Sequence, residues 1–307
     1  MLRDGSDARH GNDGTEAIAG LRDHPSFPQA MRAAAQCAVE LYRSDRLLNA
    51  LMNDRARALF THVALYLHYG HDDPDQSGLS VGAMKQLCVR VGLCSRGRCE
   101  AMLALMRASG LFAAAPSLDK RQRLLVPTEK LLELHRIRWS VHFTAMSAAI
   151  PQAAAYPVAL HDPLFIKPFV RELGRRFVGG MRVLDAAPDL EQIAERNAGM
   201  MILYSLALAS RDDDTFPPLR PVPLSIIALA TRFSVSRKHV LMLLRDAEAL
   251  QLLMRDGNAI TFLPRGREVL EMMFANLFRY MADCAEIASR ASTPAAANAS
   301  AAAVAVN

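Results

Sequence analysis

The feature that most constrains this fold is an internal repeat in the middle and C-terminal parts of the chain. The segments 79–128, the first repeat, and 224–265, the second repeat, show the same succession of apolar and polar stretches. Corresponding positions include Leu79-Ser80 with Leu224-Ser225, Ser95-Arg96 with Ser236-Arg237, Leu111 with Leu252, and Val126-Pro127 with Leu263-Pro264. The spacing between partners shortens along the repeat, as expected where loops change length but packed elements do not. Two copies of one structural unit are therefore predicted.

Both repeats predict two helices separated by a tight turn. Ser80 and Ser225 are of the residue type preferred at a helix N-cap, and each precedes apolar residues at helical spacing. Ser95 and Ser236 then cap a second, longer helix in the same way. Its buried face is predicted to contain Met102, Leu105 and Met106 in the first repeat and Val240, Leu243 and Leu244 in the second.

A β-hairpin and a long helix follow in each repeat. Gly110 ends the second helix of the first repeat, and the polar stretch 117–123 forms the hairpin tip. The second repeat has Asp256-Gly257-Asn258 at its tip, which contains an Asp-Gly hairpin signal. The predicted strands are 111–115 and 124–126, then 252–255 and 259–263, and the long helices are about 129–143 and 265–289.

This order predicts a mainly α protein built from tandem winged helix-turn-helix modules with small β-hairpin wings, joined by long helices. A plain helical bundle with incidental hairpins is the alternative, and two copies in register favour the winged helix. The predicted domains are a disordered N-terminal segment 1–24, a first winged-helix module 25–150, linking helices 151–195, a second winged-helix module 196–290 and a disordered tail 291–307.

The positive charge of the chain is concentrated in the two repeats. Between 80 and 123 there are eight Lys or Arg and two acidic residues, and between 225 and 267 there are seven and three. The repeat cores therefore carry a net charge of +10 and the rest of the chain −5, although the total is only +5. An arginine-rich chain also places arginines on any solvated face, but clustering at equivalent points of two copies favours nucleic acid as the partner.

The basic residues fall where a winged helix would meet double-stranded DNA. The first turn of the second helix faces the major groove, and a wing tip reaches the minor groove or the backbone. The predicted DNA-binding residues are Ser95, Arg96, Arg98, Asp119, Lys120, Arg121, Arg123, Ser236, Arg237, Lys238 and His239.

At the first wing the sequence resembles a known family. The segment 119–130, DKRQRLLVPTEK, is similar to the wing and following helix start of the multiple-antibiotic-resistance (MarR) regulators, and 260–268 is similar to the same junction. The resemblance implies that Arg121 enters the minor groove and that Asp119 steadies it. The sequence differs from the family pattern in two places. Leu131 occupies the place of the junction glycine, and Arg255 is the only basic residue of the second wing.

The resemblance also bears on assembly and on the shape of the binding site. The family usually works as a homodimer, so two modules in one chain suggest a single-chain pseudo-dimer, as a monomer or a further homodimer. Because the first helix turn reads Arg96-Gly97-Arg98 in one copy and Arg237-Lys238-His239 in the other, an asymmetric DNA site is predicted.

Three further groups have a functional and a structural interpretation. Cys94 and Cys99 flank a basic helix start and could sense oxidants, but such cysteines are more often reduced core residues. His62, His68, His71, Asp72 and Asp73 could bind a metal, although their spacing is loose. Trp139, His142, Phe143 and Met146 could line a small-molecule effector pocket, although such a stripe is more often core. We expect no metal and no cofactor.

Other features exclude functional classes. None of the motifs GxSxG, GxxxxGK[ST], HExxH or GxGxxG occurs, so no enzyme is predicted. There is no secretory signal, and the apolar run 198–209 is too short to span a bilayer, so a cytoplasmic protein without membrane contact is expected. The predicted function is a bacterial-type, sequence-specific regulator of transcription. The alternatives are a plasmid-type replication initiator with tandem winged helices, or a winged-helix protein-interaction scaffold.

Overall fold

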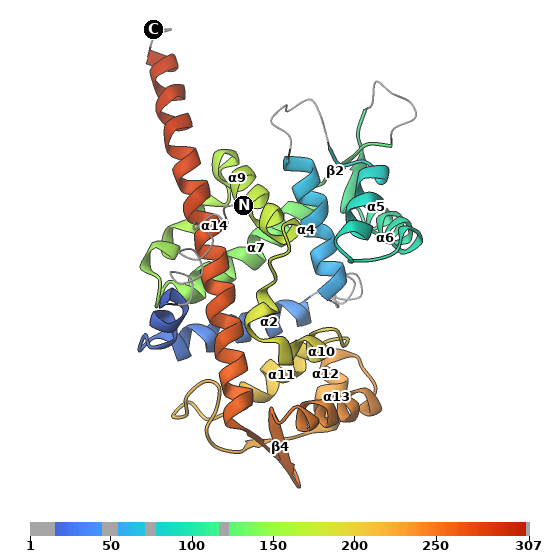
Figure 1. Ribbon diagram of the computed structural model, residues 1–307, viewed down its shortest axis with the longest axis vertical. Helices are drawn as coiled ribbons and strands as arrows, with labels where there is room; N and C mark the ends of the chain where they lie inside the picture. The colour runs from blue at the N-terminus through green and yellow to red at the C-terminus, as the bar shows by residue number, and fades with distance from the viewer. Residues whose placement is uncertain (1–15, 45–54, 71–77, 117–122, 305–307) are drawn as a thin grey trace, which may run out of the picture. The chain divides into compact units, whose positions relative to one another are not determined.

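The residues that the structure describes are mainly helical and include a two-stranded and a three-stranded sheet (Figure 1). The computed structural model describes residues 16–44, 55–70, 78–116 and 123–304. The chain divides into two compact units, each assembled from three segments. The first-repeat unit consists of Asp45–Ser140, Ala155–Arg182 and Asp283–Asn307, and the second-repeat unit of Met1–Ser44, Val141–Ala154 and Val183–Ala282.

Within the first-repeat unit, the elements of the repeat follow one supporting helix. Helix α4 packs against α5, β2 and α9, with α9 its most extensive partner. Gly174 of α9 makes this close packing feasible, because a Cβ atom there would lie 2.3 Å from the ring of Tyr66. The elements are α4 (Arg55–Tyr69), α5 (Val81–Arg90), α6 (Arg96–Ala108), β1 (Phe112–Ala114), β2 (Leu125–Pro127), α7 (Glu129–Met146), η1 (Pro151–Ala155), α8 (Tyr156–Ala159) and α9 (Pro163–Val178). Helix α7 continues into the other unit from Val141, and η1 belongs to that unit except for Ala155.

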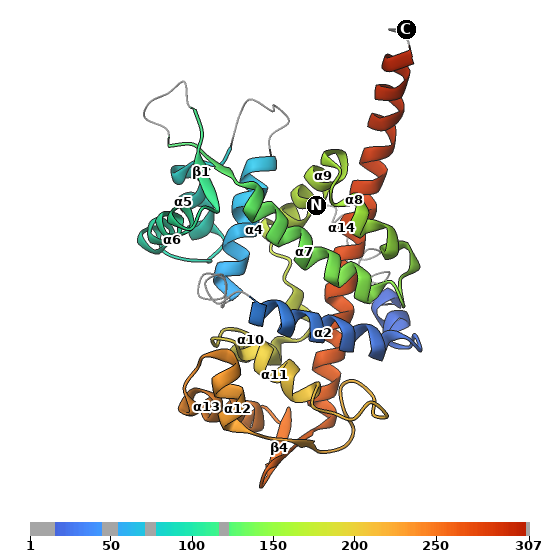
Figure 2. The same ribbon diagram turned by 180° about the vertical axis from the view of Figure 1, so that it is seen from behind.

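In the second-repeat unit, helix α2 (Phe27–Ser44) lies against α11 (Figure 2). The core of this unit contains Phe278, whose ring centroid lies 6.2 Å from that of Phe27 and 5.8 Å from that of Phe274. The remaining elements are η2 (Val183–Ala186), η3 (Pro188–Leu190), α10 (Glu191–Ala194), α11 (Gly199–Ala207), β3 (Val222–Pro223), α12 (Ile226–Phe233), α13 (Arg237–Ala249), β4 (Leu253–Asp256), β5 (Ala259–Phe262) and α14 (Pro264–Val304), the last of which continues into the first-repeat unit.

All four predicted N-cap serines cap helices. Each side-chain oxygen accepts a hydrogen bond from the backbone N–H three residues later, which satisfies a donor that the helix leaves unpaired. The pairs are Ser80 with Ala83 at 3.0 Å, Ser95 with Arg98 at 3.3 Å, Ser225 with Ala228 at 3.2 Å and Ser236 with His239 at 3.1 Å. The helix starts predicted from the sequence are therefore confirmed.

The two repeats also share backbone hydrogen bonds at their turns. Where the second helix ends, Leu111 donates to Met106 and Leu252 donates to Ala247, both at 2.9 Å. The residue between helix and strand is left-handed in both copies, Gly110 with φ 73° and Gln251 with φ 56°. At the far end of each hairpin, Thr128 donates to Leu111 and Leu263 to Leu252, both at 3.0 Å. The correspondence seen in the sequence is thus present in the backbone.

A third strand was not predicted. In the second repeat β3 pairs antiparallel with β5, which also pairs with β4, giving the order β3-β5-β4. In the described part of the first repeat, an isolated bridge between Ser80 and Leu124 occupies the corresponding place beside the hairpin. The segment that precedes the first helix of each repeat therefore lies along the returning hairpin strand.

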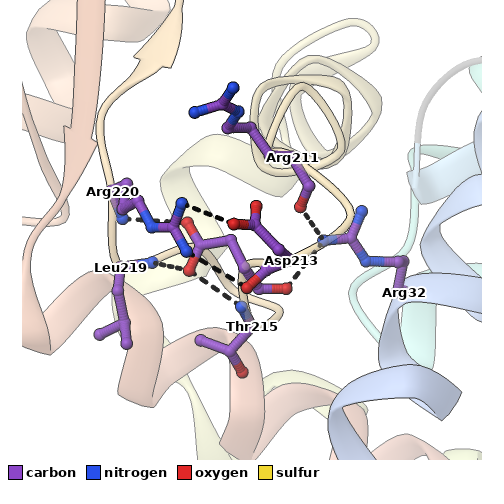
Figure 3. Close-up of polar contacts among 7 residues, drawn as sticks. Arg32, Arg211, Asp213, Thr215, Leu219 and Arg220 are labelled. Carbon is purple, nitrogen blue, oxygen red and sulfur yellow. Dashed lines mark hydrogen bonds and ion pairs between the residues drawn. The ribbon is translucent and has the colours of Figure 1, made fainter.

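The loop before β3 is ordered by two charged side chains (Figure 3). The Asp214 carboxylate accepts backbone N–H bonds from Thr215, Leu219 and Arg220 at 2.9, 3.3 and 3.0 Å. From α2, the Arg32 guanidinium donates to the Ser210 hydroxyl at 2.8 Å and to the carbonyl oxygens of Arg211 and Asp214 at 3.4 Å. The hydrogen bonds of Arg32 therefore hold this loop against α2, just before the chain enters the sheet at β3.

The structure corrects the predicted buried face of α6. Leu105 is 48% exposed, whereas Met102 and Met106 are 8% and 1% exposed. Leu103 is buried instead, at 2%. With 100° between successive helix residues, Cys99, Met102, Leu103 and Met106 share one face, and Leu105 lies at its edge.

Both ends of the described chain include helical residues. Residues 16–22 form a helical segment inside the predicted disordered stretch 1–24, whose first 15 residues lie outside the described part of the chain. Helix α14 continues to Val304, through most of the segment 291–307 that was expected to be disordered. Alanine has the highest helix propensity, so this alanine-rich segment can prolong a helix that packing has already started.

Candidate nucleic-acid interface

The N-terminus of α6 carries the first group of predicted contact residues. Ser95 caps the helix, and Arg96 and Arg98 lie exposed in its first turn. The unpaired backbone N–H groups and the positive end of the helix dipole lie at the same end of α6 as these two arginines. The geometry therefore suits an anionic partner such as a phosphate group.

The N-terminus of α13 has the same arrangement with one difference. Ser236 caps the helix, and Arg237 and Lys238 are exposed. The ring of His239 is half-buried, and its Nε2 lies 2.8 Å from the carbonyl oxygen of Asn197. Since Nε2 must donate this bond, His239 fixes the helix to the preceding segment instead of presenting a free donor.

The wings differ in what can be described. Asp119, Lys120 and Arg121 lie outside the described residues, and Arg123, at the start of the returning strand, is exposed. In the second wing, the Arg255 guanidinium donates to the Glu248 carboxylate at 2.8 and 2.5 Å. This side-chain bonding lowers the pKa of Glu248. Arg255, the basic residue of the second wing, is therefore already paired within its own repeat.

Other basic residues counted in the repeat charge are also paired. Lys85 lies 2.5 Å from Glu100, and Arg265 donates to both carboxylate oxygens of Asp189 at 2.9 and 2.8 Å. The sequence alone did not reveal these partners. The net charge of the repeats therefore includes cations that are already paired, and α6 and α13 both carry exposed basic residues.

The outward face of α13 contains residues that the sequence analysis missed. Met242 is 37% exposed, and Arg245 is exposed as well. Met242 follows Lys238 by four residues and Arg245 follows it by seven, so the three residues lie on one face of the helix. The spacing from Lys238 was the signal that could have identified them.

The two cysteines at the start of α6 have pKa values that are shifted in opposite directions. Cys99 is fully buried, and a hydrogen bond with the Cys88 thiol lowers its pKa, whereas burial raises the pKa of the Cys94 thiol. All five cysteines are free thiols. Sensing of oxidants through Cys94 and Cys99 therefore stays a prediction.

Of the histidines predicted as metal ligands, His62 lies in an aromatic cluster of the first-repeat unit, whereas His68 packs against Tyr69 with ring centroids 4.7 Å apart. The ring of His62 is 4.5 Å from that of His135 and 5.9 Å from Trp139, which also packs against Phe169 at 5.2 Å. The His135 Nε2 lies 3.0 Å from the Thr61 hydroxyl oxygen. Among the described residues no group of three metal-ligating side chains comes together, and the predicted ligands at 71–73 lie outside the described part.

The aromatic and methionine residues proposed for an effector pocket are largely buried. Trp139 is 4% exposed, and Phe143 and Met146 are fully buried. Their burial is what the alternative interpretation as core residues predicts.

The buried His135 predicts a dependence of stability on pH. Burial, and then the positive charges of His62 and Arg138, hold the pKa of His135 well below its ordinary value. The unfolded chain binds a proton near pH 6.5 and the native protein does not, so stability must fall as the pH drops below that point. The slope should approach about 1.4 kcal/mol per pH unit for this residue.

Urea unfolding from pH 7.5 to 5 measures this effect. The variant His135→Gln keeps a donor for Thr61 but cannot titrate, so its stability should depend less steeply on pH than that of the wild type. Equal slopes in the two proteins would show that His135 is not held neutral by its surroundings.

No helix in the described part of the chain is both long and apolar enough to cross a membrane. Comparisons with known protein families, curated proteins and solved structures found no match.

Proposed function

We propose that this chain is a sequence-specific double-stranded DNA-binding protein that regulates transcription in the cytoplasm. Its two repeats would be winged helix-turn-helix modules of the MarR-like kind, acting together as a single-chain pseudo-dimer. The observation that carries the proposal is the repeated placement of two exposed basic residues in the first turn of a serine-capped helix, Arg96 and Arg98 in α6 and Arg237 and Lys238 in α13.

The physical basis is the match between these helix ends and DNA. A duplex carries a phosphate charge about every 1.7 Å of its axis, so exposed arginine and lysine side chains beside unpaired backbone N–H groups bind it strongly. The helix that follows the turn has the diameter of the major groove, where base edges are distinguishable. Two non-identical copies favour an asymmetric site.

Selection from a random pool of duplexes, followed by affinity measurements at several salt concentrations, tests this function. We expect one enriched sequence without perfect inverted symmetry and a steep loss of affinity with salt. Enriched sites that recur as tandem copies would indicate a replication initiator. Absence of binding at low salt would exclude both and leave the protein-interaction scaffold.

A further inference from the structure

Helices α6 and α13 have the same length and the same type of N-cap, and they bury equivalent positions. Both have 13 residues and a serine N-cap. Their buried positions also coincide one for one when the N-caps are superposed: Cys99 with Val240, Met102 with Leu243, Leu103 with Leu244, and Met106 with Ala247. The same helix positions must therefore face outward in both copies.

The outward faces differ sharply in chemistry. The outward positions are exposed in both helices: Gly97, Ala101, Ala104 and Ala108 in α6, and Lys238, Met242, Arg245 and Ala249 in α13. None of the four in α6 has a side chain that can donate a hydrogen bond. In α13 one cationic donor lies on each side of Met242, Lys238 before it and Arg245 after it.

The acidic residues of α13 do not cancel these charges. Asp246 forms an ion pair with Arg196, and Glu248 forms one with Arg255. Lys238 and Arg245, by contrast, make no side-chain hydrogen bond or ion pair with another described residue, although the charge of Arg245 is among the causes that lower the pKa of Glu248. The cations of the outward face are thus available, while the neighbouring carboxylates are engaged at the flank of the helix.

We propose, on the basis of the DNA-binding function above, that base recognition resides in the second repeat and is carried out by Lys238, Met242 and Arg245. Lysine and arginine donate to the O6 and N7 atoms of guanine, and an apolar side chain contacts the methyl group of thymine. Seven helix residues span about 10.5 Å, which matches roughly three base pairs. The element read by α13 is therefore a short segment containing guanine at its ends and thymine between them.

The first repeat then has a different task. Arg96 and Arg98 lie about 100° to either side of the outward stripe of α6, so they are directed toward the two walls of the groove. Phosphates line these walls, and contacts with them orient a protein without reading sequence. The small residues Gly97 and Ala101 allow the helix backbone to approach the groove closely.

Two double variants of the full chain test this division. K238A/R245A removes two positive charges from the second repeat, and the matched control R90A/R107A removes two exposed arginines from the first. For each, affinity is measured for the duplex selected by the wild type and for one with the selected bases scrambled. We expect K238A/R245A to reduce the ratio of the two affinities about tenfold or more, and the control to leave this ratio unchanged.

A second, independent test transfers the three α13 side chains to α6, in a protein called the transfer variant. G97K/A101M/A104R places the three α13 side chains on exposed positions of α6, and selection with it should enrich sites containing a second copy of the same short element. The proposal is overturned if K238A/R245A retains the full ratio, if the control loses it equally, or if the transfer variant selects the wild-type site. Absence of duplex binding by the wild type would instead refute the proposed function itself. Unchanged thermal unfolding confirms that each variant is folded.

Discussion

Charge reversal of both first-turn arginines of α6, R96E/R98E, is expected to weaken duplex binding at least about 100-fold at 0.15 M salt without changing the order of preference among sequences. Each substitution removes a cation from beside a phosphate and places a carboxylate there. Both residues are exposed and lie in the first helix turn, so the change acts on the ligand more than on the core.

The salt dependence separates this outcome from its alternative. Each lost phosphate contact should reduce the slope of log affinity against log salt by about one, so the double variant should lose about two. If instead the enriched sequence changes while the slope stays nearly constant, then Arg96 and Arg98 read base edges. Thermal unfolding of the variant serves as the control, since reversal on an exposed helix turn should leave it nearly unchanged.

The sequence was informative wherever structure is determined locally. The four serine caps, the paired helices and the hairpins were all predicted, because capping bonds span three residues and helical periodicity is visible within about two turns. The error at Leu105 arose from the same source, since Met102, Leu105 and Met106 fit helical spacing as well as the true buried set does. Periodicity alone does not determine where the edge of a buried face lies.

Contacts between distant residues were not predictable in this way. Arg265 and Asp189 are 76 positions apart, and His239 and Asn197 are 42 apart, so nothing in the local sequence marks them as partners. The two-residue strand β3 was missed for the same reason, because its identity comes only from pairing with β5. These contacts alter the functional interpretation most, since they decide which basic residues are available to a ligand.

Replacement of Gly266 by alanine is expected to destabilise the second-repeat unit by about 3 kcal/mol or more. Gly266 lies in the first turn of α14, and a Cβ atom there would come within 1.9 Å of the Leu252 carbonyl oxygen and 2.7 Å of its carbon. These are backbone atoms, and the same carbonyl accepts the N–H of Leu263 that closes the hairpin. Relief of the clash therefore requires α14 to move away from the strand.

Gly82→Ala is the matched control, because Gly82 lies in the first turn of α5 and its added Cβ would meet only the Ser80 Oγ at 3.8 Å. Alanine should stabilise that helix by up to about 1 kcal/mol. Urea unfolding followed by circular dichroism compares the two, and similar midpoints for both variants would contradict the close approach at Gly266. Since the hairpin and α13 meet at Leu252, the Gly266 variant should also lose the sequence preference assigned to the second repeat, whereas the Gly82 variant should retain it.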